Sequence, residues 1–249
     1  LSTSPEERCD PLSPVLRRTL DASEAIAGGL PDRADFLHAV FCQVGMPRKR
    51  TEARTFERQS GSASLLLEAG RLWSGTGWKE LPIPYGSRPR LVMVHISSEA
   101  VRTQSRRIEI GDSIRDFLIR LGITPNGGPR GGYTMFKHQM EALAACRLML
   151  GFNAHGRAVT IDTKPIQRFE AWLHSDGLQH TMWPGELELS PEFFDTLTGH
   201  AVPLDPRALA ALKDSALALD VYTLLAHRLC RVNRAEGIKV SWANLRDQF

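Results

Sequence analysis

The chain has 249 residues, 42% of them apolar and 24% charged, a balance typical of a globular protein with a sizeable core. Its formal net charge of +3 at pH 7 permits an anionic partner but does not require one. No apolar run approaches the roughly 20 residues that span a bilayer, and no signal-peptide pattern opens the chain. We therefore expect a cytoplasmic protein with no membrane partner.

The sequence lacks the spacings that most enzymes and metal sites need. Its four cysteines form no Cys-x-x-Cys pair, so we expect small buried groups in a reducing compartment rather than a zinc ribbon or a redox motif. No two of the eight histidines are spaced His-x-His, and Gly-x-Ser-x-Gly and His-Glu-x-x-His are absent. We predict a protein that is not an enzyme and that needs no metal or cofactor.

In the first third of the chain, the sequence predicts an arm, a helix and a strand. Residues 1–30 have scattered prolines and weak periodicity, so we expect a mobile arm with at most a marginal helix. Apolar residues from Phe36 to Val44 follow helical spacing. The basic residues 47–61 are either a solvated linker or an arm that contacts phosphates. "SASLLLEAGRLW" then predicts a strand, followed by hairpin-like residues.

Three helices are expected in the middle of the chain. Apolar residues from Leu91 to Val101 recur at helical spacing, with His95 on that side as a satisfied core histidine. Ser113 and Asp116 have the spacing of a capping box, which predicts the start of a second helix. A third helix is predicted for residues 134–150.

The glycine-rich stretch "RLGITPNGGPRGGYTMFKHQ", residues 120–139, separates the second and third helices. A nucleotide-binding P-loop needs Gly-Lys-Ser/Thr, and a dinucleotide fold needs a strand before its glycines. Here the lysine–hydroxyl pair is absent, and an amphipathic helix precedes the loop. These absences exclude both kinds of nucleotide-binding loop, so we predict a long turn between the two helices.

Two short β-prone runs follow within residues 157–173, separated by the turn-like "DTKP". Helix, helix, turn, helix and β-hairpin is the order of a winged helix-turn-helix. We therefore predict an α+β fold with a winged-helix domain in this part of the chain.

The rest of the chain partly repeats this order. "TMWPGELELS" predicts a strand, and "KVSWANLRDQF" predicts a brief strand and the start of a helix. Four helix N-caps are expected, at Ser190, Asp205, Ser215 and Ser241. Three of the five tryptophans are assigned to the core, namely Trp172, Trp183 and Trp242.

The third helix offers a candidate DNA-contacting face. Thr134, Lys137, His138, Glu141 and Ala145 lie opposite its core stripe, where short polar side chains suit base edges and phosphates. The same residues also fit a plain solvated face. A frame of basic residues that could neutralise several phosphates favours the DNA interpretation. Its members are Arg102, Arg106, Arg107, Arg130, Arg157 and Lys164.

Four blocks of sequence carry a family resemblance: "IPYGSRPRLVMVHISSEAVRTQSRRIEIGDSIRDFLIRLGI", "LSPEFFDTL", "VPLDPRALAALKDSALALDVYTLLAHRL" and "VSWANLRDQF". Over residues 36–249 and in the same order, they resemble the RepA-type plasmid replication initiators of Gram-negative bacteria. The resemblance implies tandem winged-helix domains that bind iterons in double-stranded origin DNA, help to melt AT-rich DNA, and recruit the host initiator and replicative helicase. It also implies homodimers, formed through the N-terminal winged helix, that bind the operator and control plasmid copy number, without an ATP site.

The resemblance divides the chain into three parts. We expect the mobile arm at 1–30, a first winged-helix domain for DNA binding and dimerisation at 31–175, and the first part of a second one at 176–249. The family continues past "ANLRDQF", so we expect part of the second DNA reader to be missing. Residues 190–249 carry as many acidic as basic side chains, which agrees with a missing basic helix.

A different function remains open on the same fold. A winged-helix module could serve dimerisation or transcriptional repression without initiator activity. Its subunits would then pair through the hairpin at 157–173 or the strand near 63–68.

Overall fold

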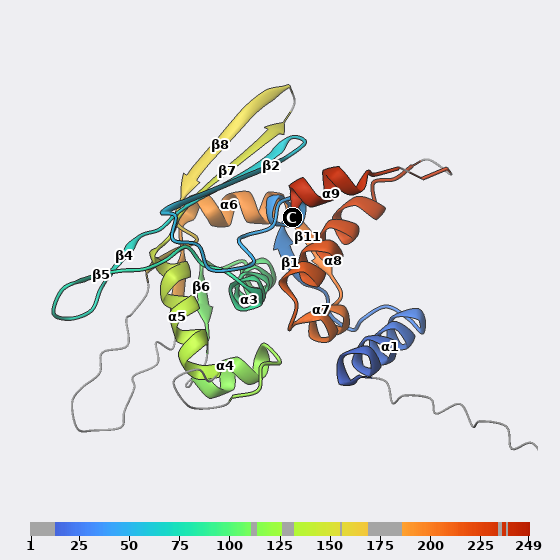
Figure 1. Ribbon diagram of the computed structural model, residues 1–249, viewed down its shortest axis with the longest axis horizontal. Coiled ribbons are helices and arrows are strands. Elements are labelled where there is room, and N and C mark those ends of the chain that lie inside the picture. Colours follow the sequence, from blue (N-terminus) through green and yellow to red (C-terminus); the bar gives the residue numbers. More distant parts are fainter. Residues whose placement is uncertain are drawn as a thin grey trace, which may run out of the picture.

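Figure 1 shows the computed structural model, in which helices pack among several small sheets, some of which project from the body of the molecule. The structure describes residues 13–110, 114–125, 132–154, 156–168, 186–233, 236–237 and 239–249. Helices and strands are interspersed along these ranges, so the expected α+β class is confirmed. No helix in the described part of the chain has both the length and the apolar character that crossing a bilayer requires.

A four-stranded antiparallel sheet forms the upper part of the view in Figure 1. Its strands, in spatial order, are β2 (Thr55–Ser60), β3 (Ala63–Glu68), β7 (Arg147–Ala154) and β8 (Arg157–Thr163). Alternate residues of β3 are buried, and Leu65 and Leu67 pair with Leu150 and Leu148 of β7. Helices α2 (Ala39–Gln43) and α6 (Pro191–Gly199) pack against strands of this sheet.

Three smaller sheets join other segments. The pair β1 (Asp35–His38) and β11 (Ala201–Leu204) is antiparallel and connects the two halves of the chain. The second sheet has the order β6 (Arg107–Glu109), β10 (Glu186–Leu189) and β9 (Ile166–Arg168). The third is a projecting hairpin of β4 (Arg71–Trp73) and β5 (Trp78–Glu80).

Helix α3 (Ser87–Thr103) lies at the centre of the core. Buried residues cover most of its circumference, as expected for a helix that packs on several sides. Helices α4 (Ile114–Arg120) and α5 (Gly132–Ala145) follow it, and Phe117 and Phe136 join them edge to face with ring centroids 5.7 Å apart. The three helices predicted for this part of the chain are therefore present, while Ser113 lies outside the described residues.

The C-terminal helices begin where their caps predict. Helices α6, α7 (Pro206–Leu212), α8 (Ala216–Leu229) and α9 (Trp242–Gln248) each start one residue after a side chain that accepts a backbone N–H. The four capping residues are Ser190, Asp205, Ser215 and Ser241. All four predicted N-caps are confirmed.

Residues 14–27 form a regular helix, α1 (Pro14–Ala27), within the segment expected to be a mobile arm. The Arg18 guanidinium lies 2.7 Å from Asp214 Oδ2 and donates to the backbone oxygen of Ala211 at 3.1 Å. Helix α1 therefore contacts the C-terminal part of the chain through α7.

Two predictions about strands are wrong in the middle of the chain. The third helix ends at Ala145 and β7 begins at Arg147, because Leu148 and Leu150 alternate inward on a sheet instead of continuing the helical stripe. In addition, β8 pairs with β7 and not with the run after "DTKP", which forms β9 and joins β10. The hairpin that follows α5 is therefore β7–β8.

Other local expectations also fail. Residues 35–38 form β1, and the helix predicted from Phe36 starts only at Ala39, because β11 supplies a strand partner. The basic stretch is not a linker throughout, since its second half is β2. Residues 239–240 form no strand.

Three side-chain expectations need correction. His95 packs on Phe117, but its Nε2 is buried without a hydrogen-bond partner among the described residues, so it is not a satisfied histidine. Trp242 is 87% exposed and Cys230 is exposed, so neither belongs to the core. Trp172 and Trp183 lie outside the described residues.

Candidate nucleic-acid interface

Helix α5 carries the face that the sequence assigns to DNA, and its buried side fixes which residues point outward. Phe136 and Met140 are buried, and the helix packs against α3, β9 and β4. On the other side Thr134 is exposed, while Lys137 and His138 are half-buried. The N-terminal half of this face is therefore accessible to a ligand.

The hairpin β4–β5 covers the C-terminal half of the same face. Lys79 Nζ of β5 lies 2.8 Å from Glu141 Oε2, and the Glu141 side chain retains only 11% exposure. Ala145, one turn further along α5, is buried. The face of α5 that was predicted as one surface is thus divided, because the β4–β5 hairpin, which is distant in sequence, covers its C-terminal half.

Basic residues act on one another around the accessible half, and Glu141 compensates part of their charge. Burial lowers the pKa of His138, and Lys79 and Arg50 lower it further against the opposing charge of Glu141. Burial also lowers the pKa of Lys137, where Glu141 opposes the effect and Lys79 adds to it. Cations within electrostatic reach of one another favour the binding of an anion.

Arg102 is held in a network that ties the end of α3 to β1. Its guanidinium donates to Asp35 and to the backbone oxygen of Ala34, both at 2.5 Å, and to Glu99 at 2.8 Å. Two carboxylates thus compensate its charge.

Arg106 and Arg107 lie at the start of β6, where acidic residues of β10 face them. Arg106 Nη1 is 3.5 Å from Glu188 Oε1. Arg107 is exposed and lines a polar pocket together with Arg168, Glu186 and Glu188. Of the two, Arg107 has the more accessible guanidinium.

The remaining predicted residues are distributed over separate elements. Arg157 is exposed at the tip of the β7–β8 hairpin, and Lys164 is exposed just after β8. The charge of Lys164 acts to lower the pKa of the Cys146 thiol, which burial raises. Arg130 falls outside the described residues. Of the predicted residues that the structure describes, it therefore brings together Thr134, Lys137, His138 and Glu141, the last of which is paired with Lys79.

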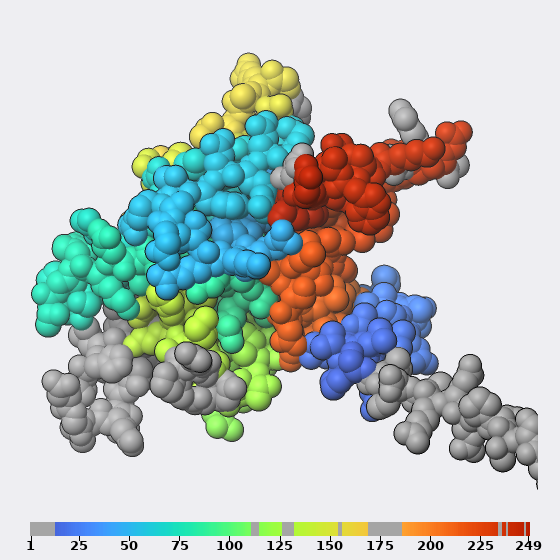
Figure 2. Space-filling model, viewed as in Figure 1, coloured from blue at the N-terminus to red at the C-terminus, as the bar shows by residue number. Residues whose placement is uncertain are grey.

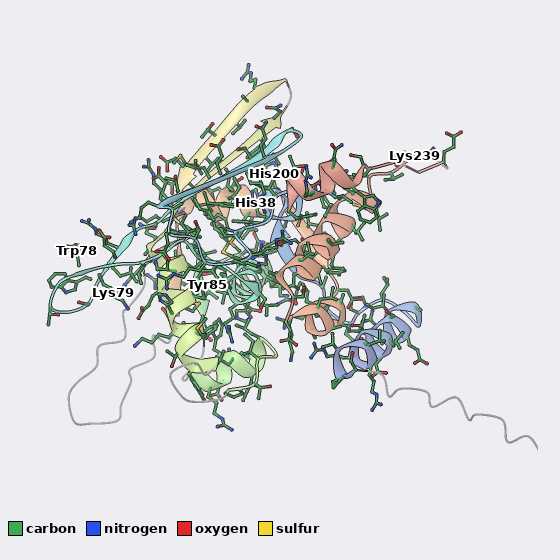
Figure 3. All side chains as sticks on the ribbon, in the orientation of Figure 1. His38, Trp78, Lys79, Tyr85, His200 and Lys239 are labelled. Carbon is green, nitrogen blue, oxygen red and sulfur yellow. The ribbon has the colours of Figure 1, made fainter. Side chains whose placement is uncertain are left out.

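Sequence reasoning missed the contribution of the β4–β5 hairpin to this surface. Figure 2 shows the hairpin standing out from the body of the molecule, and Figure 3 shows Trp78 on its projecting part with Lys79 nearer α5. Trp73 and Trp78 are 52% and 68% exposed. The signal in the sequence is "LWSGTGWK", two tryptophans that flank a glycine-containing turn.

The described residues contain no group of three or more potential metal ligands. A cavity of about 620 Å³ between α3, α4 and α7 is lined by apolar residues such as Leu91 and by charged residues, among which Arg33 and Glu99 pair at 2.7 Å.

The α+β fold has two helices followed by a hairpin, and its surface combines cations with exposed aromatic rings. These features favour a protein that binds nucleic acid. The family model for the plasmid encoded RepA protein matches residues 83–244. This match covers more than half of the chain, so the chain belongs to that family and the resemblance of the four blocks is confirmed. Family membership indicates a role in plasmid replication. The comparisons with curated proteins and with solved structures gave no match.

Proposed function

We propose that the chain is a plasmid replication initiator that binds repeated sequences of its origin as double-stranded DNA and has no catalytic activity of its own. The family match over residues 83–244 carries this proposal. On the family's pattern, the bound protein opens AT-rich DNA and recruits the host initiator and the replicative helicase in the cytoplasm. A dimeric form represses its own operator.

The order of elements supports a winged-helix domain in the first half. Helices α3, α4 and α5 are followed directly by the β7–β8 hairpin. In a winged helix-turn-helix the last helix before the hairpin lies in the major groove. On this pattern, α5 would lie in the major groove of DNA and the β7–β8 hairpin would be the wing. Helices α6 to α9 form the start of the proposed second domain.

The proposed DNA contacts follow from accessibility and charge. Thr134 and His138 would face the groove, with phosphates contacted by Lys137 and by the exposed basic residues Arg107, Arg157 and Lys164. Arg130 in the preceding loop completes the proposed set. Arg102, Arg106 and Glu141 face opposite charges within the protein, and we propose that they position the surface.

A salt titration tests the proposed contacts. Lys137→Ala and Lys164→Ala should each weaken binding to a duplex of the cognate origin. Each should also reduce the slope of log K against log salt by about one, because one released counterion is lost with each phosphate contact. The measurement is fluorescence anisotropy of the labelled duplex over a range of salt concentrations.

Arg17→Ala is the matched control, because Arg17 is an exposed cation on α1, an element without a proposed DNA contact. It should leave the slope unchanged. Equal slopes for all three variants and the unmodified chain would remove Lys137 and Lys164 from the interface.

A dimerisation or repressor module is the second candidate function. The arrangement of the large sheet favours a dimer that pairs through an edge strand over one that pairs through β3. Strand β3, at residues 63–68, has neighbours on both edges and is not free to pair with another subunit. Among the described strands, β2 and β8 are the edges of this sheet. A dimer that sediments unchanged with or without origin DNA would support this candidate over the first.

A further inference from the structure

The β4–β5 hairpin presents two tryptophans side by side at its end. Trp73 and Trp78 are directly opposite in register, with ring centroids 5.7 Å apart and ring planes at 69°. The turn between them is closed by Ser74, whose backbone N–H and hydroxyl both donate to the Gly77 oxygen, at 2.9 and 2.8 Å. Both rings nevertheless remain more than half exposed.

The hairpin is attached to the molecule through its opposite face. Leu72 and Lys79 are cross-strand partners on that side; Leu72 packs against the core and Lys79 bonds to Glu141 of α5. The Leu81 N–H also donates to the Gly70 oxygen at 3.1 Å, which closes the base of the hairpin. The tryptophans are therefore free of this anchoring role, and their exposed ring surface is available to a ligand.

Two arginines provide positive charge on the tryptophan side of the hairpin. Arg71 bonds to Glu80 at 2.5 Å and Arg54 lies 4.0 Å from the same carboxylate, so two guanidinium groups share one acidic partner. On the other side, Lys79 is paired with Glu141 of α5 at 2.8 Å. Flat rings beside an excess of positive charge complement a ligand that has flat rings and negative charge.

We propose that Trp73 and Trp78 bind single-stranded nucleic acid, stacking on unpaired bases while Arg71 and Arg54 lie near the phosphates. In a duplex the faces of the bases are covered by their neighbours, whereas unpaired bases offer them to aromatic side chains. A protein partner fits less well, because the residues beside the rings are charged or belong to a Ser-Gly-Thr-Gly turn, not to an aliphatic surface. This site goes beyond the proposed duplex binding and does not depend on it.

Fluorescence anisotropy with the full chain tests this site. The probes are a labelled single-stranded oligothymidylate and a duplex of the same length. Trp73→Ala and Trp78→Ala should each weaken single-strand binding by about tenfold, the loss expected for one stacked base, and should change duplex binding by less than about twofold. Trp78→Phe, which keeps a flat ring, should restore most of the single-strand affinity.

Trp242→Ala is the matched control, because Trp242 is an exposed tryptophan on α9, away from the hairpin. Circular dichroism melting checks that every variant keeps the fold. Single-strand affinity unchanged by Trp78→Ala, or reduced equally by Trp242→Ala, would overturn the proposal. Equal losses on both probes would also overturn it, since the hairpin would then belong to the duplex interface. A third probe, a duplex of the cognate origin, separates the two proposals: failure of the origin-binding proposal would appear as equal binding of the unmodified chain to both duplexes, with the single-strand result unaffected.

Discussion

Arg90 of α3 is buried in the core and forms a two-pronged contact with Asp220 of α8. Its Nε and Nη2 donate to the two carboxylate oxygens at 2.6 and 2.8 Å. The remaining donors reach the backbone oxygens of Met46, Pro47 and Gly86. Burial raises the pKa of Asp220 while Arg90 opposes the rise, so the carboxylate depends on its partner for its charge.

Asp220→Ala should lower the free energy of unfolding by about 3–5 kcal/mol, because Arg90 would keep a buried charge without its carboxylate. Asp214→Ala is the control, since it removes the partner of Arg18 in an exposed pair and should cost less than about 1 kcal/mol. Urea unfolding followed by circular dichroism measures both. Similar losses in the two variants would contradict the importance of the buried pair.

His38 should make the stability depend on pH. It is fully buried, its Nδ1 accepts from the Val40 N–H at 3.1 Å, and its Nε2 lies 3.2 Å from Thr196 Oγ1. Burial, together with the nearby His200, lowers the pKa of His38 from 6.5 to about 3. Below pH 6.5 the unfolded chain binds a proton that the folded state excludes, so stability is complete above pH 6.5 and falls as the pH decreases toward 3.

The expected loss from this group is about 2 kcal/mol between pH 7 and pH 5. His38→Asn keeps an acceptor for the Val40 N–H but cannot titrate, so this part of the pH dependence should disappear. Urea unfolding at several pH values gives the comparison. An equal slope in the variant would assign the pH dependence to other groups.

At the scale of elements, local signals in the sequence were sufficient to predict where helices start. They were not sufficient to predict which strands pair. Ser190, Ser215 and Ser241 start helices as predicted, because a cap depends on residues within one turn. Strand β1 was missed because its partner β11 is distant in sequence, and β7 was misassigned although β8 follows it directly, since its other partner, β3, is distant. The same reason explains why the divided face of α5 could not be predicted.

Gly70 allows the β4–β5 hairpin to approach α5 closely. A Cβ at this position would lie 1.8 Å from the backbone oxygen of Ala145, so Gly70→Ala should force the backbone apart and cost about 1–3 kcal/mol in urea unfolding. Gly77, in the turn of the same hairpin, has no atom within 4 Å of the corresponding position, and Gly77→Ala should change stability by less than about 0.5 kcal/mol. Equal effects would mean that close packing at Gly70 does not set the position of the hairpin.

At the scale of the whole molecule, contacts cross the expected boundary between residues 31–175 and 176–249. Strand β1 pairs with β11, and α3 bonds to α8 through Arg90 and Asp220. The division into two domains stays a prediction, and the helix α1 of the N-terminal segment contacts α7.

The family and the α+β class could be read from the sequence, because they rest on whole blocks of residues and on the order of elements. The site could be read only in part. Thr134, Lys137 and His138 share one helix and lie together, whereas Arg102 and Glu141 are paired with Asp35 and Lys79, partners that no helical spacing indicates.

The central claim is that the chain recognises repeated sequences in the origin of its plasmid. A footprint of the purified chain on that origin, with excess unrelated duplex as competitor, tests it most directly. We expect protection at regularly spaced repeats, with a preference over scrambled sequence of at least about tenfold, the effect of one or two read base pairs. Weak protection spread evenly over origin and scrambled DNA would contradict the claim.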